Sequence, residues 1–528
     1  MQGTGQKARS DETHSAWPAI LLPLRDHAMN RPGKLAVKDE QGSLDYQSLC
    51  AEIEIQADAF RRGGIGQGDP VLLLLDVCVD SVVAYWALHA IGAVLVVGDP
   101  TGTFSNIEHF AKVSGASHIL AGQKVGDKIK GLSACKMWRS AGPDRWSVTQ
   151  AFWGADNGPV TSLGRSAHQL PEHCALILFS SGTTSAPKAI VHKRQAMQAL
   201  HETLLKTWKL NPDDVVLGAL PFHTIYGLIF NAASTIYAGA TLVLQKRFHP
   251  EHALTAIEEH GVTTSAMVPA MLIMMLNLDG KERFDLSTLR MVYSASAPIS
   301  QADIDSFTMF ADTVVNCNYG MTEIPGAAVE VAGVDHTDGS AGKVSPGFEF
   351  SIRGPEGREL PVGETGEIAM RGPTLMAEYL GEPEKTDDRI RDGWIYSQDK
   401  GRLDEHGNVF VLGRMSDMII RGGLNISPLE IEDVLSAHPN VVDVAIIGPE
   451  HAVLGQSIRA VVVPTKMPAN EDLTTQLLEH CKLELAPPKV PQDFVFIEEI
   501  PRNAGGKIDR KALLQSHQDK AATDGGKR

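Results

Sequence analysis

The sequence predicts an α/β protein with largely parallel sheets, followed by a β-rich segment and a small α+β unit. Apolar runs typical of strands, VLLLL (71–75) and AVLVV (93–97), flank the helical pattern AYWALHAIG (84–92). This strand, helix, strand order predicts a parallel sheet covered by helices. The strand-like runs recur at ALILF (175–179), TLVLQ (241–245), TSAMVPA (264–270) and LRMVYSA (289–295).

The pattern changes twice further along the chain. Residues 348–372 alternate short strand-like runs with Gly and Pro, which predicts hairpins and a β-rich subdomain at about 343–415. From residue 416, helical patterns at 426–439 and 473–485 alternate with strand-like runs at 441–448 and 458–465. We therefore expect a large N-terminal domain, 1–415, and a small C-terminal domain, 416–528, with a disordered tail from about 516.

Composition limits the classes of function. The 528 residues are 43% hydrophobic and 21% charged, as in ordinary globular proteins. A net charge of -16 argues against a broad basic face for nucleic acid. The six cysteines lie far apart without metal-ligand spacing, which is typical of reduced thiols. The polar start and the shortness of the longest apolar stretch, 88–97, predict a cytoplasmic protein without a membrane span.

The segment FSSGTTSAPK (179–188) follows the apolar run ALIL and gathers five hydroxyl side chains around a glycine. Hydroxyls and backbone N–H groups in a tight turn after a buried strand form a nest for phosphate oxygens, and a lysine adds a cation. The segment lacks the GxxxxGK[ST] pattern of a Walker A loop. The predicted phosphate-binding residues are Ser180, Ser181, Gly182, Thr183, Thr184 and Lys188.

This segment resembles the signature loop of the acyl-adenylating superfamily, which contains acyl- and aryl-CoA synthetases, peptide-synthetase adenylation domains and luciferase. Ser185 and Ala189 stand where that pattern usually has glycine. The resemblance is closest to acid–CoA ligases. It implies a large N-terminal ATP- and acid-binding domain and a small mobile C-terminal domain that carries a catalytic lysine.

Two further segments resemble the family in order. SASAP (294–298) resembles the turn whose backbone holds adenine, which assigns Ser296, Ala297 and Pro298 to ATP. NYGMTE (318–323) resembles the motif in which Tyr319 stacks on adenine, Thr322 meets the α-phosphate and Glu323 binds Mg²⁺; a carboxylate is indeed a hard ligand for this cation. The ATP-binding residues implied by this second motif are Asn318, Tyr319, Gly320, Met321 and Thr322.

The remaining segments belong to the β-rich and C-terminal parts. GWIYSQDKG (393–401) resembles the ribose-binding motif with Asp399 as acceptor, and Gln398 replaces its usual glycine. In the hinge-like segment 413–432, the resemblance assigns Arg414 to ribose and Ser416 to the hinge. The same segment carries Gly422 and Gly423, which the resemblance places beside a pantetheine tunnel. Residues 501–513 resemble the motif of the catalytic Lys507, which follows two glycines and is therefore a mobile cation.

LPFHTIYGL (220–228) resembles the family segment near the acid carboxylate, and the resemblance implies that this segment and Ser294 form the acid pocket. Tyr226 and Gly227 are expected to line it. His223 lies three residues before Tyr226, whereas many coenzyme A ligases have a gating histidine two before, so Thr224 is the alternative occupant of that place. Members of this family that activate amino acids commonly have an aspartate in this region to hold the substrate ammonium. None occurs between Pro221 and Thr235, so the resemblance favours an acid without an α-amino group.

The function predicted by these motifs is activation of a small carboxylic acid with ATP and Mg²⁺ to acyl-AMP. The acyl group then passes to a thiol, with coenzyme A as the expected acceptor. A stand-alone enzyme that loads the phosphopantetheine of an acyl carrier protein is the alternative within the family. Outside it, a non-catalytic nucleotide-binding protein remains open, whereas an esterase lacks its GxSxG nucleophile motif.

Overall fold

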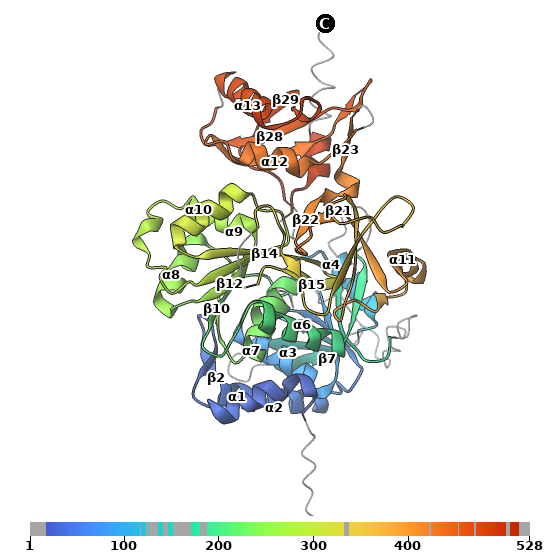
Figure 1. Cartoon of the computed structure of the whole chain (residues 1–528). Helices are drawn as coiled ribbons and strands as arrows, with labels where there is room; N and C mark the ends of the chain where they lie inside the picture. Colours follow the sequence, from blue (N-terminus) through green and yellow to red (C-terminus); the bar gives the residue numbers. More distant parts are fainter. Residues whose placement is uncertain are drawn as a thin grey trace, which may run out of the picture.

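The protein is described by a computed structural model (Figure 1). The described residues are 17–116, 118–122, 125, 136–140, 146–151, 170–179, 187–331, 337–421, 424–451, 453–468, 471–502 and 507–516. Two large sheets and their helices form the N-terminal part. The C-terminal elements α12 (Pro428–Ser436) and α13 (Glu471–Glu484) lie at the opposite end of the molecule from α1 (Leu22–Asn30).

The first large sheet has nine strands in the described part of the chain, in the order β16-β15-β14-β13-β12-β10-β11-β1-β2. Its central pairs are parallel, whereas β14, β15 and β16 pair antiparallel at one edge and β2 pairs antiparallel at the other. In sheet order, the strands are Lys343–Val344, Ile324–Val329, Val314–Met321, Met291–Ser294, Thr264–Met267, Val215–Gly218, Thr241–Leu244, Leu35–Lys38 and Ser43–Asp45.

The second large sheet has eight described strands, in the order β19-β9-β8-β4-β3-β5-β6-β7. Its centre is parallel, and β8, β9 and β19 form antiparallel pairs at one edge. In sheet order, the strands are Glu378–Tyr379, Ala189–Lys193, Cys174–Phe179, Val94–Val97, Pro70–Leu74, His118–Ala121, Lys136–Ser140 and Trp146–Ala151.

Helices cover both sheets, and their ends follow local sequence signals. Helix α2 begins after Asp45, whose carboxylate accepts a hydrogen bond from the Ser48 N–H at 2.7 Å, and ends before Gly63. Helix α3 is buried along nearly its whole length, which explains its apolar sequence. The helices of this part are α1, α2 (Tyr46–Arg62), α3 (Val79–Ile91), α4 (Phe104–Ser114), α6 (Arg194–Thr207), α7 (Ser234–Tyr237), α8 (Pro250–His260), α9 (Pro269–Leu276) and α10 (Gln301–Ala311), with a π-helix, η2 (Tyr226–Ala233).

The β-rich segment forms a five-stranded antiparallel sheet, as its hairpin pattern predicts. Helix α11 (Pro383–Arg389) precedes its short strand β20. The strands are β17 (Glu349–Arg353), β18 (Gly366–Arg371), β20 (Ile390–Arg391), β21 (Trp394–Leu403) and β22 (Val409–Arg414).

The C-terminal part combines α12 and α13 with two small sheets and has its own apolar cluster. A short 3-10 turn, η4 (Met415–Asp417), connects it to β22. The predicted α/β class with a large N-terminal part and a smaller α+β part is confirmed, while the boundary at residue 415 stays a prediction. The strands are β23 (Ile419–Arg421), β24 (Leu424–Ile426), β25 (Val441–Ile447), β26 (Glu450–His451), β27 (Gly455–Gln456), β28 (Arg459–Pro464) and β29 (Asp493–Phe496).

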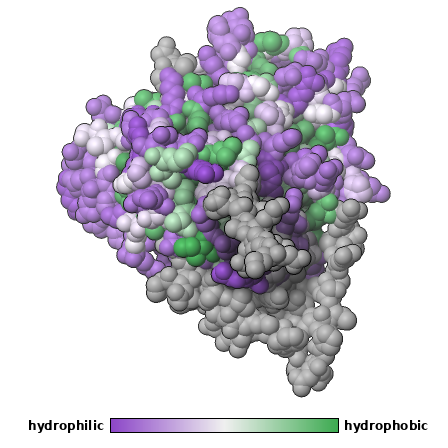
Figure 2. All heavy atoms as spheres, turned by 90° about the horizontal axis from the view of Figure 1, so that it is seen from below, coloured by the Kyte–Doolittle hydropathy of each residue, from purple (hydrophilic) through white to green (hydrophobic). Residues whose placement is uncertain are grey.

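The described surface is largely hydrophilic in the view of Figure 2, as expected for a chain in which 21% of the residues are charged. Figure 2 shows that hydrophilic residues predominate on the described part of the face seen from below. Among the residues that the structure describes, we find no helix with the length and apolar character needed to cross a bilayer.

A buried ion pair ties three strands of the nine-stranded sheet together. Asp214, which is 3% exposed, precedes β10, and its two oxygens accept hydrogen bonds from Nε and Nη2 of Arg290, both at 2.9 Å. Arg290 precedes β13. The Thr263 hydroxyl, before β12, donates to the same carboxylate at 2.7 Å. The Asp214 carboxylate is thus paired with the Arg290 guanidinium and also accepts a hydrogen bond from the Thr263 hydroxyl.

We predict that Asp214→Asn lowers the free energy of unfolding by roughly 3 kcal/mol, the low end for a broken buried ion pair, because the Arg290 side chain keeps 31% exposure. Urea unfolding measures this loss. The neighbouring Asp213 pairs with Arg31 at the surface, with 82% and 47% exposed side chains, so Asp213→Asn is the matched control and changes little. Equal losses in both variants would contradict the prediction.

Candidate active site

The candidate site is built around the turn between β14 and β15, where the nine-stranded sheet meets the eight-stranded one. Met321 pairs with Ile324 across this turn, and Thr322 and Glu323 occupy it. The Glu323 side chain is buried, with 8% exposure. Gly320 allows the close approach, because a Cβ there would lie 3.0 Å from backbone atoms of Ile324 and Gly326.

Two side chains of the eight-stranded sheet hold this turn. The ring of His192, on β9, lies with Nε2 2.7 Å from the Thr322 carbonyl oxygen, to which it donates. The Tyr379 hydroxyl, on β19, donates to Glu323 Oε1 at 2.7 Å. The Met376 N–H adds a backbone bond to the Glu323 carbonyl at 2.7 Å. The predicted phosphate and metal residues are therefore fixed by both sheets.

Lys188 lies at the same edge of the eight-stranded sheet. Its Nζ is 4.7 Å from the centre of the Tyr379 ring, a cation–π distance. Ala189 is buried at the start of β9, where it fits an ordinary strand although the resemblance favours glycine. The other predicted phosphate-loop residues lie outside the described residues, as does Ser185: they are Ser180, Ser181, Gly182, Thr183 and Thr184.

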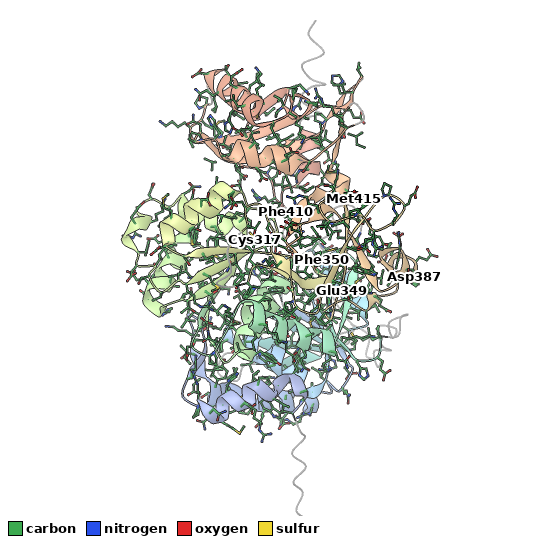
Figure 3. All side chains as sticks on the ribbon, viewed as in Figure 1. Cys317, Glu349, Phe350, Asp387, Phe410 and Met415 are labelled. Carbon is green, nitrogen blue, oxygen red and sulfur yellow. The ribbon has the colours of Figure 1, made fainter. Side chains whose placement is uncertain are left out.

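The predicted nucleoside residues come together on the β-rich side. The Tyr319 hydroxyl donates to Asp399 Oδ2 at 2.7 Å, and Arg414 Nε lies 2.9 Å from Asp399 Oδ1. Asp399 on β21 and Arg414 on β22 are direct partners across that ladder. Burial and the neighbouring Asp399 raise the pKa of Tyr319, which keeps its hydroxyl a donor. Figure 3 labels Phe350, whose ring centre is 6.4 Å from that of Tyr319.

Two non-glycine residues near this site have left-handed backbone conformations. Gln398 has φ 61°, and Ser296 has φ 72°. The first value explains why the family pattern has glycine at Gln398, because a side chain is strained in this region. Ser296, with Ala297 and Pro298, follows β13 as predicted, and its strain falls where adenine is expected.

Lys507 approaches the site from the C-terminal part. Desolvation lowers the pKa of Lys507 first, and the positive charge of Arg414 lowers it further, while Asp399 and Glu323 act in the opposite direction. Lys507 therefore lies within electrostatic range of Asp399, which is predicted to bind ribose, and of Glu323, which is predicted to bind Mg²⁺. The side chain is still exposed to solvent, so protein atoms surround it without sealing it. Ser416, the predicted hinge, lies in η4 next to Met415, which Figure 3 labels between the two parts.

The predicted acid pocket lies around the π-helix η2. The Thr224 hydroxyl donates to the Pro221 carbonyl at 2.9 Å and accepts from the Gly227 N–H at 3.0 Å, so it caps this helix. A Cβ on Gly227 would lie 2.2 Å from the Pro221 oxygen, which makes glycine necessary there. The Tyr226 hydroxyl donates to the Tyr293 carbonyl at 3.0 Å. Short π-helical turns are frequent at functional sites.

The other pocket residues surround this helix. His223 Nδ1 lies 3.7 Å from Asp99 Oδ1; burial lowers the pKa of His223, and Asp99 partly offsets that effect. Asn318 Nδ2 donates to the Tyr226 hydroxyl at 3.2 Å. Ser294 is 2% exposed, and its hydroxyl has no hydrogen-bond partner among the described residues. The pocket roles of these residues stay predictions.

The donor set at the turn fits a hard divalent cation held mainly by phosphate oxygens. Among the described residues, no group of three or more His, Cys, Asp or Glu side chains could hold a metal ion. Magnesium is usually bound by one or two carboxylates together with substrate phosphates and water. Glu323 as the single protein carboxylate agrees with that mode. Gly422 and Gly423, predicted for pantetheine, lie outside the described residues.

Comparison with known proteins identifies the class. Residues 24–380 match the family described as AMP-binding enzyme, and residues 430–507 match the AMP-binding enzyme C-terminal domain. The chain belongs to this family of AMP-binding enzymes.

Relatives agree over nearly the whole length. The chain is 31% identical to a fatty acid–[acyl-carrier-protein] ligase, ScoC, of Streptomyces coeruleorubidus, covering 95% of this chain and 96% of that protein. It is 29% identical to an indoleacetate–CoA ligase of Aromatoleum aromaticum, covering 93% and 96%. The crystal structure of ATP-bound MatB from Rhodopseudomonas palustris superposes with a TM-score of 0.83 at 28% identity, covering 95% and 99%.

Sequence reasoning missed three side chains that contact the predicted site residues: His192, Tyr379 and Asp99. His192 and Tyr379 reach the turn from strands whose neighbours could not be known from one sequence. Asp99 follows β4, at the carboxyl end of a parallel strand, where functional side chains of α/β sheets gather. Its place after a predicted strand was the only feature of the sequence that could have indicated a role for Asp99.

We predict that His192 makes folding stability depend on pH. Burial lowers the pKa of His192 from 6.5 to about 4, so the unfolded chain takes up its proton first as the pH falls. Stability is therefore lost between pH 6.5 and about 4, by roughly 3 kcal/mol for this group. Urea unfolding over this pH interval shows a flatter profile for His192→Asn.

The matched control is His406→Asn, because the His406 side chain is 70% exposed. Its profile follows the wild type. A His192→Asn profile as steep as that of the wild type would contradict the assignment.

Proposed function

We propose that the protein activates a small carboxylic acid with MgATP and transfers the acyl group to the thiol of coenzyme A. The observation that supports this most is that Lys507 lies within electrostatic range of Asp399, on β21, and of Glu323, at the β14–β15 turn. The family membership and the acid–thiol ligases among the relatives agree with it.

In the first half-reaction, an oxygen of the acid carboxylate attacks the α-phosphorus of ATP. The new bond is an acyl–phosphate anhydride, and pyrophosphate leaves. Two anions must approach each other, so catalysis depends on alignment and on cancelled negative charge. Lys507 bridges the carboxylate and the α-phosphate, while the Thr322 hydroxyl binds a phosphate oxygen. Bound Mg²⁺, held by Glu323, supplies further charge neutralisation.

The nucleoside is held on the β-rich side. Asp399 accepts the ribose hydroxyls, since each carboxylate oxygen can accept more than the one hydrogen bond it receives from Tyr319 or Arg414. The Tyr319 ring offers its face to adenine. The chain after Ser294 provides backbone contacts. Burial around these groups strengthens each charged interaction.

In the second half-reaction, the thiol attacks the acyl carbonyl and AMP leaves. The C-terminal part turns about Ser416, which withdraws Lys507 and brings Gly422 and Gly423 beside the pantetheine arm. Ser416 lies in the short exposed turn η4, a suitable place for a change in φ and ψ. The same face of the N-terminal part serves both half-reactions. The C-terminal part therefore has to turn between them, in an alternation of two positions.

A carrier-protein phosphopantetheine is the second candidate acceptor. The observation in its favour is the 31% identity to an acyl-carrier-protein ligase over 95% of the chain. Coenzyme A and a carrier protein present the same arm, so thioester formation with each acceptor, assayed side by side, separates the two.

We predict acid-stimulated ATP–pyrophosphate exchange when the protein is given Mg²⁺ and a panel of aromatic, short aliphatic and fatty acids. Lys507→Ala lowers the exchange rate on the order of 10²-fold or more, because it removes a charge that acts on the transition state. Thioester formation from supplied acyl-AMP is largely kept.

Lys511→Ala is the matched control from the same segment and exchanges like the wild type. Equal loss of both half-reactions in Lys507→Ala would contradict the alternation. A wild type without exchange for any acid would contradict the function itself and would favour a non-catalytic nucleotide-binding protein.

A further inference from the structure

We propose that Tyr379 is a positioning residue that aims the Glu323 carboxylate at the divalent cation and holds the Lys188 ammonium beside the same phosphates. This inference rests on the proposed function. It adds one phenol that acts on two charged groups of the ATP site without touching the reacting atoms.

The geometry places one ring between the two charges. Tyr379 is 1% exposed, and its hydroxyl donates to Glu323 Oε1 at 2.7 Å. Lys188 Nζ lies 4.7 Å from the centre of the same ring. A single side chain therefore contacts a predicted metal ligand through its oxygen and a predicted phosphate ligand through its face.

Backbone hydrogen bonds hold the short strand that carries the Tyr379 ring. In the β9–β19 ladder Tyr379 pairs with Ile190 and Glu378 with Val191. The Leu380 N–H donates to the Ala189 carbonyl at 2.8 Å, directly beside Lys188. Few rotamers remain open to a buried tyrosine on such a short, paired strand, so the hydroxyl occupies a defined point.

The Tyr379 hydroxyl engages one oxygen of the Glu323 carboxylate, Oε1. A carboxylate is an acceptor only, with two oxygens. Oε1 is engaged by Tyr379, whereas no described residue donates to Oε2. A hydrogen bond to a ligating carboxylate orients it and tunes its metal affinity.

The test measures metal binding directly, with Mn²⁺ in place of Mg²⁺ because carboxylate and phosphate oxygens suit both ions. Electron paramagnetic resonance of free Mn²⁺ gives its affinity for the full-length enzyme saturated with ATP. Tyr379→Phe keeps the ring and removes only the hydroxyl. We expect the Mn²⁺ affinity to fall about tenfold, the lower range for loss of a bond to a metal ligand.

Tyr46→Phe is the matched control. Tyr46 is fully buried, and its hydroxyl donates to the Ala240 carbonyl at 2.7 Å, far from the turn in the sequence. Both variants lose a buried hydroxyl bond and should unfold at similarly reduced urea concentrations. Only Tyr379→Phe should change the Mn²⁺ affinity, which separates positioning from general stability.

A double-mutant comparison adds a second readout. Glu323→Gln weakens Mn²⁺ binding by itself. If the Tyr379 hydroxyl acts through Glu323, then adding Tyr379→Phe to Glu323→Gln changes the affinity by less than twofold, because the two effects are not additive. Tyr379→Leu, which also removes the ring from Lys188, additionally weakens ATP binding in the absence of the metal.

The outcomes are distinct. A tenfold loss confined to Tyr379→Phe, and absent in the Glu323→Gln background, supports the inference. If wild type and Tyr379→Phe bind Mn²⁺ alike in the presence of ATP, Tyr379 has no positioning role and the proposed function is unaffected. If the wild type itself shows no ATP-dependent Mn²⁺ binding, both the function and the inference are wrong.

Discussion

The candidate site depends on one structural constraint, the attachment of the β14–β15 turn to the edge of the other large sheet. Two side-chain hydrogen bonds attach the turn, one from His192 to the Thr322 carbonyl and one from Tyr379 to the Glu323 carboxylate. Each sheet alone would present half of the site. Joined at this point, they place Thr322, Glu323 and Lys188 along one edge, an arrangement that suits the proposed binding of a triphosphate and its metal.

Charge explains why a strongly negative chain can bind an anion. The net charge of -16 is a property of the whole surface, whereas the site gathers Lys188, Arg414 and Lys507 locally. Asp399 is paired with Arg414, so it adds hydrogen-bond acceptors without an isolated buried charge. Lys507 comes from the C-terminal part, which makes the local positive charge dependent on how that part is placed.

Much of the fold could be predicted from the sequence, because buried parallel strands and amphipathic helices leave periodic patterns. The strand-like runs 71–75 and 175–179 correspond to strands at 70–74 and 174–179, and the helix predicted at 426–439 spans 428–436. The family motifs, which occur in order along the chain, predicted that Tyr319, Asp399 and Arg414 are site residues. The structure brings these three side chains together. The π-helix, the capping role of Thr224 and the contacts of Tyr379 could not be foreseen, since each depends on backbone registers and sheet neighbours that no local pattern encodes.

If Lys507 meets the triphosphate at the β14–β15 turn, as proposed, bound MgATP should protect the Lys507 amine from chemical modification. Desolvation lowers the pKa of Lys507, which raises the fraction of its amine that is neutral and can react with acylating reagents. Mass spectrometry then follows modification of Lys507 and, for comparison, of Lys482, which is half exposed in the same part of the chain. We expect MgATP to slow the modification of Lys507 several-fold and to leave the modification rate of Lys482 unchanged. Equal rates at Lys507 with and without MgATP would contradict it.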